Sequence, residues 1–203
     1  MSLITIDEEK CRKDAICTRV CPVGIIEQPE EGAPPRMVQG GEQLCIVCGH
    51  CVAVCPHGAL DHDSMKSADC PPVEPEMRPG PETMEHFLRS RRSVRTYKDK
   101  TVEKDRIEQL IRVASHAPSG HNRQRVCWHV LHDRDRLDAM ISHVADWMRY
   151  MIAEQPQAAR LMNMERVVAA REAGIDTICR GAPHVICANG HKQDRTSHAA
   201  CVI

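Results

Sequence analysis

Four cysteines lie close together in one short segment, followed directly by a proline: Cys45, Cys48, Cys51, Cys55 and Pro56. The spacing C-x2-C-x2-C-x3-C-P is that of bacterial-type iron–sulfur sites. A zinc ribbon would need two separated C-x-x-C pairs. A disulfide framework does not place four cysteines so densely before a proline. The segment therefore predicts a [4Fe–4S] cluster.

The same pattern occurs a second time, 34 residues earlier, with one position changed. Residues 11–22 align with residues 45–56, and three of the four cysteines are matched. Asp14 stands where the later segment has Cys48. An internal repeat of this kind indicates two copies of one structural unit. Residues 1–69 therefore resemble a ferredoxin with two clusters.

The resemblance to two-cluster ferredoxins implies a crossed set of ligands, since the fourth cysteine of each run binds the other run's cluster. The first cluster would be held by Cys11, Cys17 and Cys55, with Asp14 as the candidate fourth ligand. The second would be held by Cys45, Cys48, Cys51 and Cys21. Two histidines flank these ligands, His50 and His57; contacts with the ligands would let them tune the cluster potential, but we expect them to be merely exposed.

Asp14 leaves two alternatives open. Its carboxylate can bind iron, as carboxylates bind other transition metals, which would give a [4Fe–4S] cluster with one labile iron. Otherwise the carboxylate points to solvent and the first site holds three irons, as a [3Fe–4S] cluster. Some ferredoxins with C-x-x-D at this point use the aspartate, so the resemblance favours ligation.

Residues 70–82 separate this domain from the rest of the chain. They contain five prolines and a glycine, so no helix or strand continues through them, and we expect a stiff linker. Apolar residues then recur at helical spacing, and Thr101 is a candidate N-cap for a second helix that stops at residues 117–120. Further on, the pattern predicts a buried strand over 126–131, helices over 135–145, 146–155 and 157–173, and a strand over 184–188. The expected fold is α+β, with a second α+β domain over residues 83–203.

Two polar segments of the second domain have residue types suited to an anionic cofactor. Residues 91–95 read RRSVR, and guanidinium groups pair bidentately with phosphate. Residues 117–124 read APSGHNRQ and precede the first strand. Each alone is also typical of a solvated helix end or a polar turn. Together, with the GAPH run at 181–184, they resemble the nitroreductase family of FMN enzymes over residues 83–203.

That resemblance implies roles for eight residues and a homodimer with FMN at its interface. The flavin phosphate and pyrimidine edge would be held by Arg91, Arg92, Ser93 and Arg95. The flavin would be reached from the other subunit by Pro118, Ser119, Gly120 and Asn122. The family's later strands and last phosphate-binding residues would lie beyond Ile203, so an incomplete nitroreductase domain is expected.

Charge and composition exclude several other classes of function. Residues 1–70 carry six basic and eleven acidic side chains, and residues 71–203 carry 21 and 17. An acidic first part beside a mildly basic second part suits electron transfer between them. The sequence has no basic patch with interleaved aromatic residues, so nucleic-acid binding is not expected. No apolar run approaches the length that spans a membrane. Cluster thiolates need a reducing compartment, so a cytoplasmic protein is expected.

The combination of modules predicts an oxidoreductase. Clusters pass single electrons and FMN gathers two, so the expected reaction is reduction of a small, electron-poor molecule such as a nitroaromatic or a quinone. An external ferredoxin or dehydrogenase would supply electrons, and direct reduction by NAD(P)H stays open. No residue stands out as an acid–base catalyst. The alternative is an electron-transfer ferredoxin module joined to a non-catalytic docking or dimerisation domain.

Overall fold

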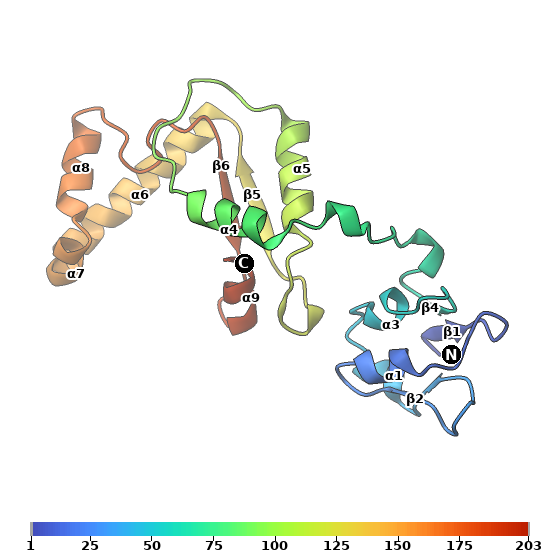
Figure 1. The fold of residues 1–203 in the computed structure, drawn as a ribbon. Helices are drawn as coiled ribbons and strands as arrows, with labels where there is room; N and C mark the ends of the chain where they lie inside the picture. Colours follow the sequence, from blue (N-terminus) through green and yellow to red (C-terminus); the bar gives the residue numbers. More distant parts are fainter. Residues whose placement is uncertain (1, 203) are drawn as a thin grey trace. The chain divides into compact units, whose positions relative to one another are not determined.

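The computed structural model describes residues 2–202 and has the expected α+β fold (Figure 1). Residue contacts divide the chain into two compact units. The first unit runs to His86 and also takes His121–Arg123, and the second contains Phe87–Gly120 and the residues from Gln124 onward. The proline-rich residues 70–82 are exposed, with one short 3₁₀ turn at Pro75–Met77.

The first unit is built from two small antiparallel pairs of strands and three short helices. Strand β1 pairs with β4, and β2 pairs with β3. The strands are β1 (Ile4–Ile6), β2 (Ile26–Glu27), β3 (Arg36–Met37) and β4 (Leu60–His62), and the helices are α1 (Ile16–Val20), α2 (Gly41–Leu44) and α3 (His50–Ala53). Each half therefore contributes one strand to each pair, as an internal repeat requires.

The 34-residue repeat is visible in the backbone itself. Three pairs of positions separated by 34 residues adopt left-handed conformations: Lys13 and Val47 with φ of 60° and 52°, Ala15 and Gly49 with 55° and 73°, and Gly24 and Gly58 with 65° and 57°. Such conformations are uncommon for residues other than glycine, so their recurrence at one spacing is specific. The two halves therefore share the turns that aim the cysteine side chains.

The core of the first unit includes several of the cysteines. Five aliphatic side chains and one thiol form the buried cluster: Ile4, Cys17, Ile25, Ile26, Val52 and Leu60. Three half-buried thiols pack against it, from Cys21, Cys45 and Cys51. A domain of this size buries little apolar surface, so a metal cluster bound by these thiols would contribute directly to its folding.

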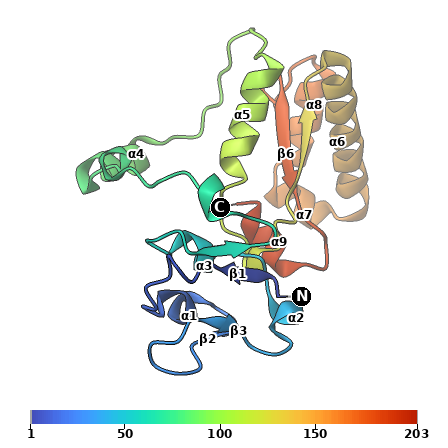
Figure 2. The same cartoon turned by 90° about the vertical axis from the view of Figure 1, so that its right-hand side faces the viewer.

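The second unit has one antiparallel pair of strands with helices around it (Figures 1 and 2). Trp128 lies opposite Ala188 in the pairing of β5 with β6. The strands are β5 (Cys127–Leu131) and β6 (Val185–Asn189), and the helices are α4 (Pro81–Ser90), α5 (Lys104–Ala114), α6 (Arg134–Glu154), α7 (Pro156–Leu161), α8 (Met164–Glu172) and α9 (Arg195–Ala200). Helix α4 begins in the first unit and ends in the second.

Helix α6 forms the main packing face of the second unit. Asp133 caps its start, since the carboxylate accepts hydrogen bonds from the backbone N–H groups of Asp135 and Arg136. The side chains of Leu137 and Ile141 are fully buried one turn apart. Helices α7 and α8 fold back along α6 and bury Ala159, Met164 and Val168. Among residues 2–202, no helix is long and apolar enough to cross a membrane.

Several expected element boundaries are wrong. Helix α5 begins at Lys104 after Glu103, so Thr101 is not its N-cap. The two helices expected over 135–145 and 146–155 are the single helix α6, because no proline or glycine interrupts it. The helix expected over 157–173 is divided where Asn163 turns left-handed, with φ of 52°.

The strand expected to be buried over 126–131 also differs. Cys127 and His129 of β5 are exposed, because alternate residues of a strand point to opposite faces.

Candidate iron–sulfur and flavin sites

The predicted cluster ligands line two hollows of the first unit. The first hollow is lined by Cys11, Asp14, Cys17 and Cys55. The second is lined by Cys21, Cys45, Cys48 and Cys51. These are the crossed sets that the ferredoxin resemblance implies, with one ligand of each hollow coming from the other half of the repeat.

Backbone turns position these side chains. In the first half, left-handed turns at Lys13 and Ala15 bracket Asp14, whose Oδ1 accepts a hydrogen bond from the Ile16 N–H at 3.1 Å. This contact holds the aspartate at the start of α1 and at the edge of the hollow. Across the hollow, the backbone N–H of Ala59 donates to the Cys55 Sγ at 3.3 Å.

Burial changes the chemistry of the thiols. Burial raises the pKa of the Cys51 thiol to about 11, and nearby Cys48 and Cys21 add to the shift. Burial also raises the pKa of Cys17, with contributions from Cys11 and other groups of the first hollow. Iron binds the thiolate, so cluster assembly has to release protons from these thiols, and the positive charge of the metal supports that release.

The donor set suits an iron–sulfur cluster rather than one metal ion. Among the described residues, no three His, Cys, Asp or Glu side chains are grouped so that they could hold a single ion. The ligands of a cluster each bind a different iron, so they surround a hollow instead of converging on a point. Soft thiolates also select such clusters over hard cations. The residues of both hollows therefore fit the cofactor that their spacing predicts.

His62 is a residue of the second hollow that sequence reasoning missed. Its side chain is buried, and its Nε2 lies 3.7 Å from the Sγ of Cys45. The flanking histidines considered from the sequence, His50 and His57, are exposed, as expected, but His57 also lines the first hollow and His50 the second. The signal that points to His62 is strand alternation, since Leu60 and His62 of β4 share the buried face.

The arginine-rich segment of the second unit is exposed. Arg91, Arg92, Ser93 and Arg95 lie in an irregular stretch directly after α4. The Arg92 guanidinium donates to the carbonyl oxygens of Arg89 and Arg91, which caps the end of that helix. Exposed guanidinium groups fit a phosphate, which they can bind bidentately.

The second predicted flavin segment is placed elsewhere in the fold. Ser119 lines a hollow of about 600 Å³ together with Gln124 and Trp128, and the arginine-rich segment does not line this hollow. The Ser119 hydroxyl accepts a hydrogen bond from the Gln124 N–H at 2.9 Å. A Cβ on Gly120 would lie 2.6 Å from the Cβ of Thr196, so glycine is required there by packing.

Pro118 and Asn122, the remaining predicted flavin residues, flank that pair. Pro118 precedes Ser119 directly. Asn122 belongs to the first unit, where its side-chain amide donates to the carbonyl oxygens of Val47 at 2.7 Å and Ile46 at 3.3 Å. Its amide is therefore engaged by backbone oxygens in this structure.

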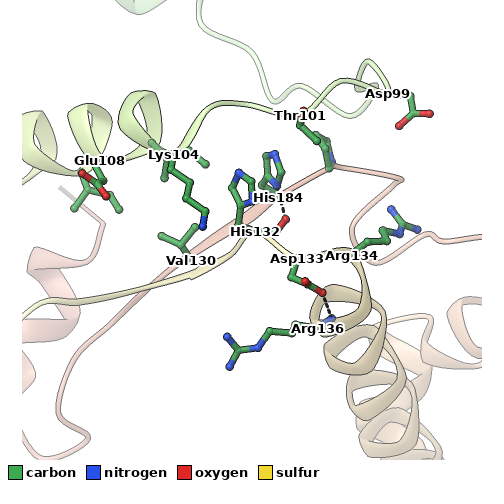
Figure 3. Close-up of a pocket in the computed structure, with 13 residues that line it drawn as sticks. Asp99, Thr101, Lys104, Glu108, Val130, His132, Asp133, Arg134, Arg136 and His184 are labelled. Atoms are coloured by element: carbon green, nitrogen blue, oxygen red, sulfur yellow. Dashed lines mark hydrogen bonds between the residues drawn. The ribbon is translucent and has the colours of Figure 1, made fainter.

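A larger hollow of about 700 Å³ lies between α5, the end of β5 and the start of β6 (Figure 3). Two histidines on its wall, His132 and His184, stack with ring centroids 4.0 Å apart. The Val102 N–H donates to the His184 Nε2 at 2.9 Å, and the His132 Nε2 lies 2.9 Å from the Val102 carbonyl oxygen. The pair therefore fixes the chain before α5 against both strands, which is a structural role for the GAPH run.

Two family profiles match the chain. The nitroreductase family matches residues 88–203, and a 4Fe–4S dicluster domain matches residues 9–60. The chain therefore belongs to the nitroreductase family and carries a 4Fe–4S dicluster ferredoxin domain before it. The fusion expected from the cysteine repeat and the two polar segments is confirmed.

Curated relatives share a short stretch of the sequence. The protein is 37% identical over 54 residues to one subunit of the anaerobic dimethyl sulfoxide reductase of Escherichia coli (strain K12), which is 27% of this protein and 24% of that subunit. It is 41% identical over 51 residues to "Ferredoxin 7Fe" of Hydrogenibacillus schlegelii, 25% of this protein and 59% of that one. An "Iron-sulfur protein" of Rhodospirillum rubrum is 45% identical over 53 residues, 25% of each protein. The chain thus spans about a quarter of the length of the first and third relatives.

Proposed function

We propose that the chain passes electrons from two iron–sulfur clusters to FMN and reduces a small, electron-poor organic molecule such as a nitroaromatic or a quinone. The observation that carries this proposal is the gathering of eight predicted ligands around two hollows, in a chain whose other part belongs to the nitroreductase family. When bound, the clusters supply single electrons and FMN combines them into a two-electron reduction.

The first cluster would be bound by Cys11, Asp14, Cys17 and Cys55, and the second by Cys21, Cys45, Cys48 and Cys51. Asp14 favours a four-iron first site, because its carboxylate lines the hollow and the hydrogen bond from the Ile16 N–H to its Oδ1 holds it there. The alternative is a three-iron site, and the name of the Hydrogenibacillus relative specifies seven irons for that protein.

In the second unit, Arg91, Arg92 and Arg95 would bind the flavin phosphate, and the Ser93 hydroxyl would donate to the flavin. Pro118, Ser119 and Gly120 would position the flavin of the partner subunit in a homodimer. This division suits the separate placement of the two segments within one chain. Asn122 would have to exchange its present carbonyl partners to take the flavin role that the family implies.

An external ferredoxin or dehydrogenase would reduce the clusters in a reducing compartment such as the cytoplasm. The acidic balance of residues 1–70 suits docking to a donor with a basic surface. Direct reduction of the flavin by NAD(P)H is the competing route. The two routes differ in whether turnover needs the clusters.

The test is cofactor content and turnover of protein purified without oxygen. We expect iron bound by both sites, FMN released on denaturation, and nitroaromatic or quinone reduction driven by reduced ferredoxin. Protein that binds iron but neither binds nor responds to added FMN would overturn the flavin assignment. That outcome would favour an electron-transfer module with a non-catalytic docking or dimerisation domain.

A further inference from the structure

His62 contacts a predicted ligand of the second cluster from inside the core. The residue is 3% exposed, and the 3.7 Å between its Nε2 and the Cys45 Sγ suits a hydrogen bond to the large sulfur atom. Both residues line the second hollow, so the contact is already present in this structure.

The direction of that hydrogen bond follows from the other ring nitrogen. The backbone N–H of Ser64 donates to the His62 Nδ1 at 3.0 Å. A backbone N–H is only a donor, so Nδ1 must be the acceptor and the proton of the neutral ring is on Nε2. The Nε2–H group therefore points at the Cys45 sulfur as a donor.

The backbone holds the ring in this place. His62 pairs with Ile4 where β4 meets β1. The His62 N–H donates to the Met65 carbonyl oxygen at 2.9 Å, and the Met65 N–H donates back at 3.0 Å. The tight turn formed by these bonds brings the Ser64 N–H against the His62 ring. The same turn therefore fixes both the tautomer and the orientation of the imidazole.

The first half of the repeat uses the equivalent position differently. Gln28 lies 34 residues before His62. Its side-chain amide donates to the carbonyl oxygens of Ala33 at 2.8 Å and Lys13 at 3.1 Å. Both amide hydrogens are thereby used on backbone oxygens. At this position of the repeat, the second half has a side chain that donates to a cysteine sulfur, and the first half does not.

We propose that His62 is a positioning residue that donates its Nε2–H to the Cys45 thiolate and raises the reduction potential of the second cluster. Reduction adds an electron to the cluster and increases the negative charge on its ligand sulfurs. A hydrogen bond to sulfur is stronger in that state, so it stabilises the reduced form. The inference rests on the proposed cluster in this hollow and is independent of flavin.

The experiment compares the full chain, purified without oxygen, with His62→Phe and His62→Gln. Phenylalanine keeps a buried ring without the donor, whereas glutamine keeps an N–H donor. Each cluster is titrated with dithionite at controlled potential and followed by electron paramagnetic resonance. The signals are assigned with Asp14→Cys, which alters a first-site ligand.

We expect His62→Phe to lower the ratio of reduced to oxidised second cluster roughly tenfold at a fixed potential, about 59 mV for a one-electron couple. His62→Gln should recover a large part of that shift, and the first cluster should not change in either variant. An unchanged second-site potential in His62→Phe, or equal shifts at both sites, would overturn the proposal.

A second measurement covers the case in which His62→Phe does not assemble the second cluster. Protein labelled with ¹⁵N-histidine and carrying His50→Gln and His57→Gln is reduced and examined by pulsed electron paramagnetic resonance. A ¹⁵N coupling on the second-site signal supports the hydrogen bond, and its absence overturns it. Failure to bind FMN or to turn over would overturn the proposed function while leaving both cluster measurements readable.

Discussion

The two units of the chain place their predicted cofactor ligands in different ways. In the first unit, eight ligands gather around two hollows because short turns repeat 34 residues apart. In the second unit, the arginine-rich segment after α4 is exposed, and Ser119 before β5 lines a hollow to which that segment does not contribute. We therefore expect each proposed cluster site to be complete within one chain, and the proposed flavin site to use residues of a second subunit.

This difference separates two kinds of constraint. The thiols predicted to bind the clusters also form part of the core of the first unit. Loss of a cluster should therefore lower the stability of this unit as well as abolish electron transfer. The arginine-rich residues proposed to bind the flavin, from Arg91 to Arg95, are exposed and carry little of the packing of the second unit. Substitutions among them should therefore change binding and leave stability nearly unaltered.

The largest expected effect comes from Cys48→Ser, which removes a second-site ligand. Iron content should fall, and reduction of bound flavin by external ferredoxin should slow at least about tenfold, since even residues behind the ligands change metal affinity by that factor. Reduction by dithionite and FMN affinity should be nearly unchanged. Stopped-flow absorbance of the flavin measures the rate.

Cys70→Ser is the matched control for Cys48→Ser. Cys70 is an exposed thiol outside both hollows, and its Sγ donates to the Lys66 carbonyl oxygen at 3.4 Å. The Cys70→Ser variant should match the parent protein in iron content and in the rate of flavin reduction by external ferredoxin. Undiminished ferredoxin-driven turnover in Cys48→Ser would show that the first unit is not the route of electrons.

The next largest effect concerns the proposed flavin residues of the second unit. Arg91→Ala and Ser93→Ala should each weaken FMN binding without lowering the thermal stability of the apoprotein. A hydrogen bond to a charged group is worth roughly 1.5–3 kcal/mol, or about ten- to a hundredfold in affinity. Fluorescence titration of apoprotein with FMN measures the change.

Arg166→Ala is the control for charge, because Arg166 is an exposed arginine of α8 that belongs to neither polar segment. A loss of affinity in this control equal to that in Arg91→Ala would mean that overall charge, and not a phosphate contact, governs binding. The dependence of FMN affinity on protein concentration tests the homodimer in the same titration.

Gly120→Ala distinguishes packing from flavin contact within the predicted flavin turn. The added Cβ would meet the Thr196 side chain at 2.6 Å, so we expect a loss of roughly 1–3 kcal/mol of stability, as for other overpacked sites. Gly80→Ala adds the same atom where nothing lies within 4 Å and should cost less. Chemical denaturation of apoprotein gives both values. A Gly120→Ala variant of normal stability that fails to bind FMN would assign the glycine to the flavin instead.

The sequence predicted the parts of the fold that depend on local spacing. The cysteine repeat placed Asp14 opposite Cys48, and the structure shows left-handed turns on both sides of each. His62 escaped notice because its role depends on the pairing of β4 with β1 and on the Ser64 N–H, neither of which a ligand motif encodes. Thr101 was a wrong N-cap because the chain before α5 is held at Val102, whose N–H donates to His184 and whose carbonyl oxygen accepts from His132, and both histidines are distant in sequence.

The smallest expected effect tests the one ligand in which the two cluster sites differ. Asp14 is exposed and accepts from the Ile16 N–H, whereas Cys48 is half-buried in its hollow. A carboxylate is a harder ligand than a thiolate and can be protonated, so the iron that it binds should be the most easily lost. Asp14→Cys should therefore slow oxidative iron loss from the first site by a few-fold and leave the second site as it was. Timed exposure to ferricyanide, followed by electron paramagnetic resonance of a three-iron signal, measures that loss. If both sites of the parent lose iron at equal rates, the aspartate is not a weak ligand, and the first hollow does not differ from the second in the way its sequence implies.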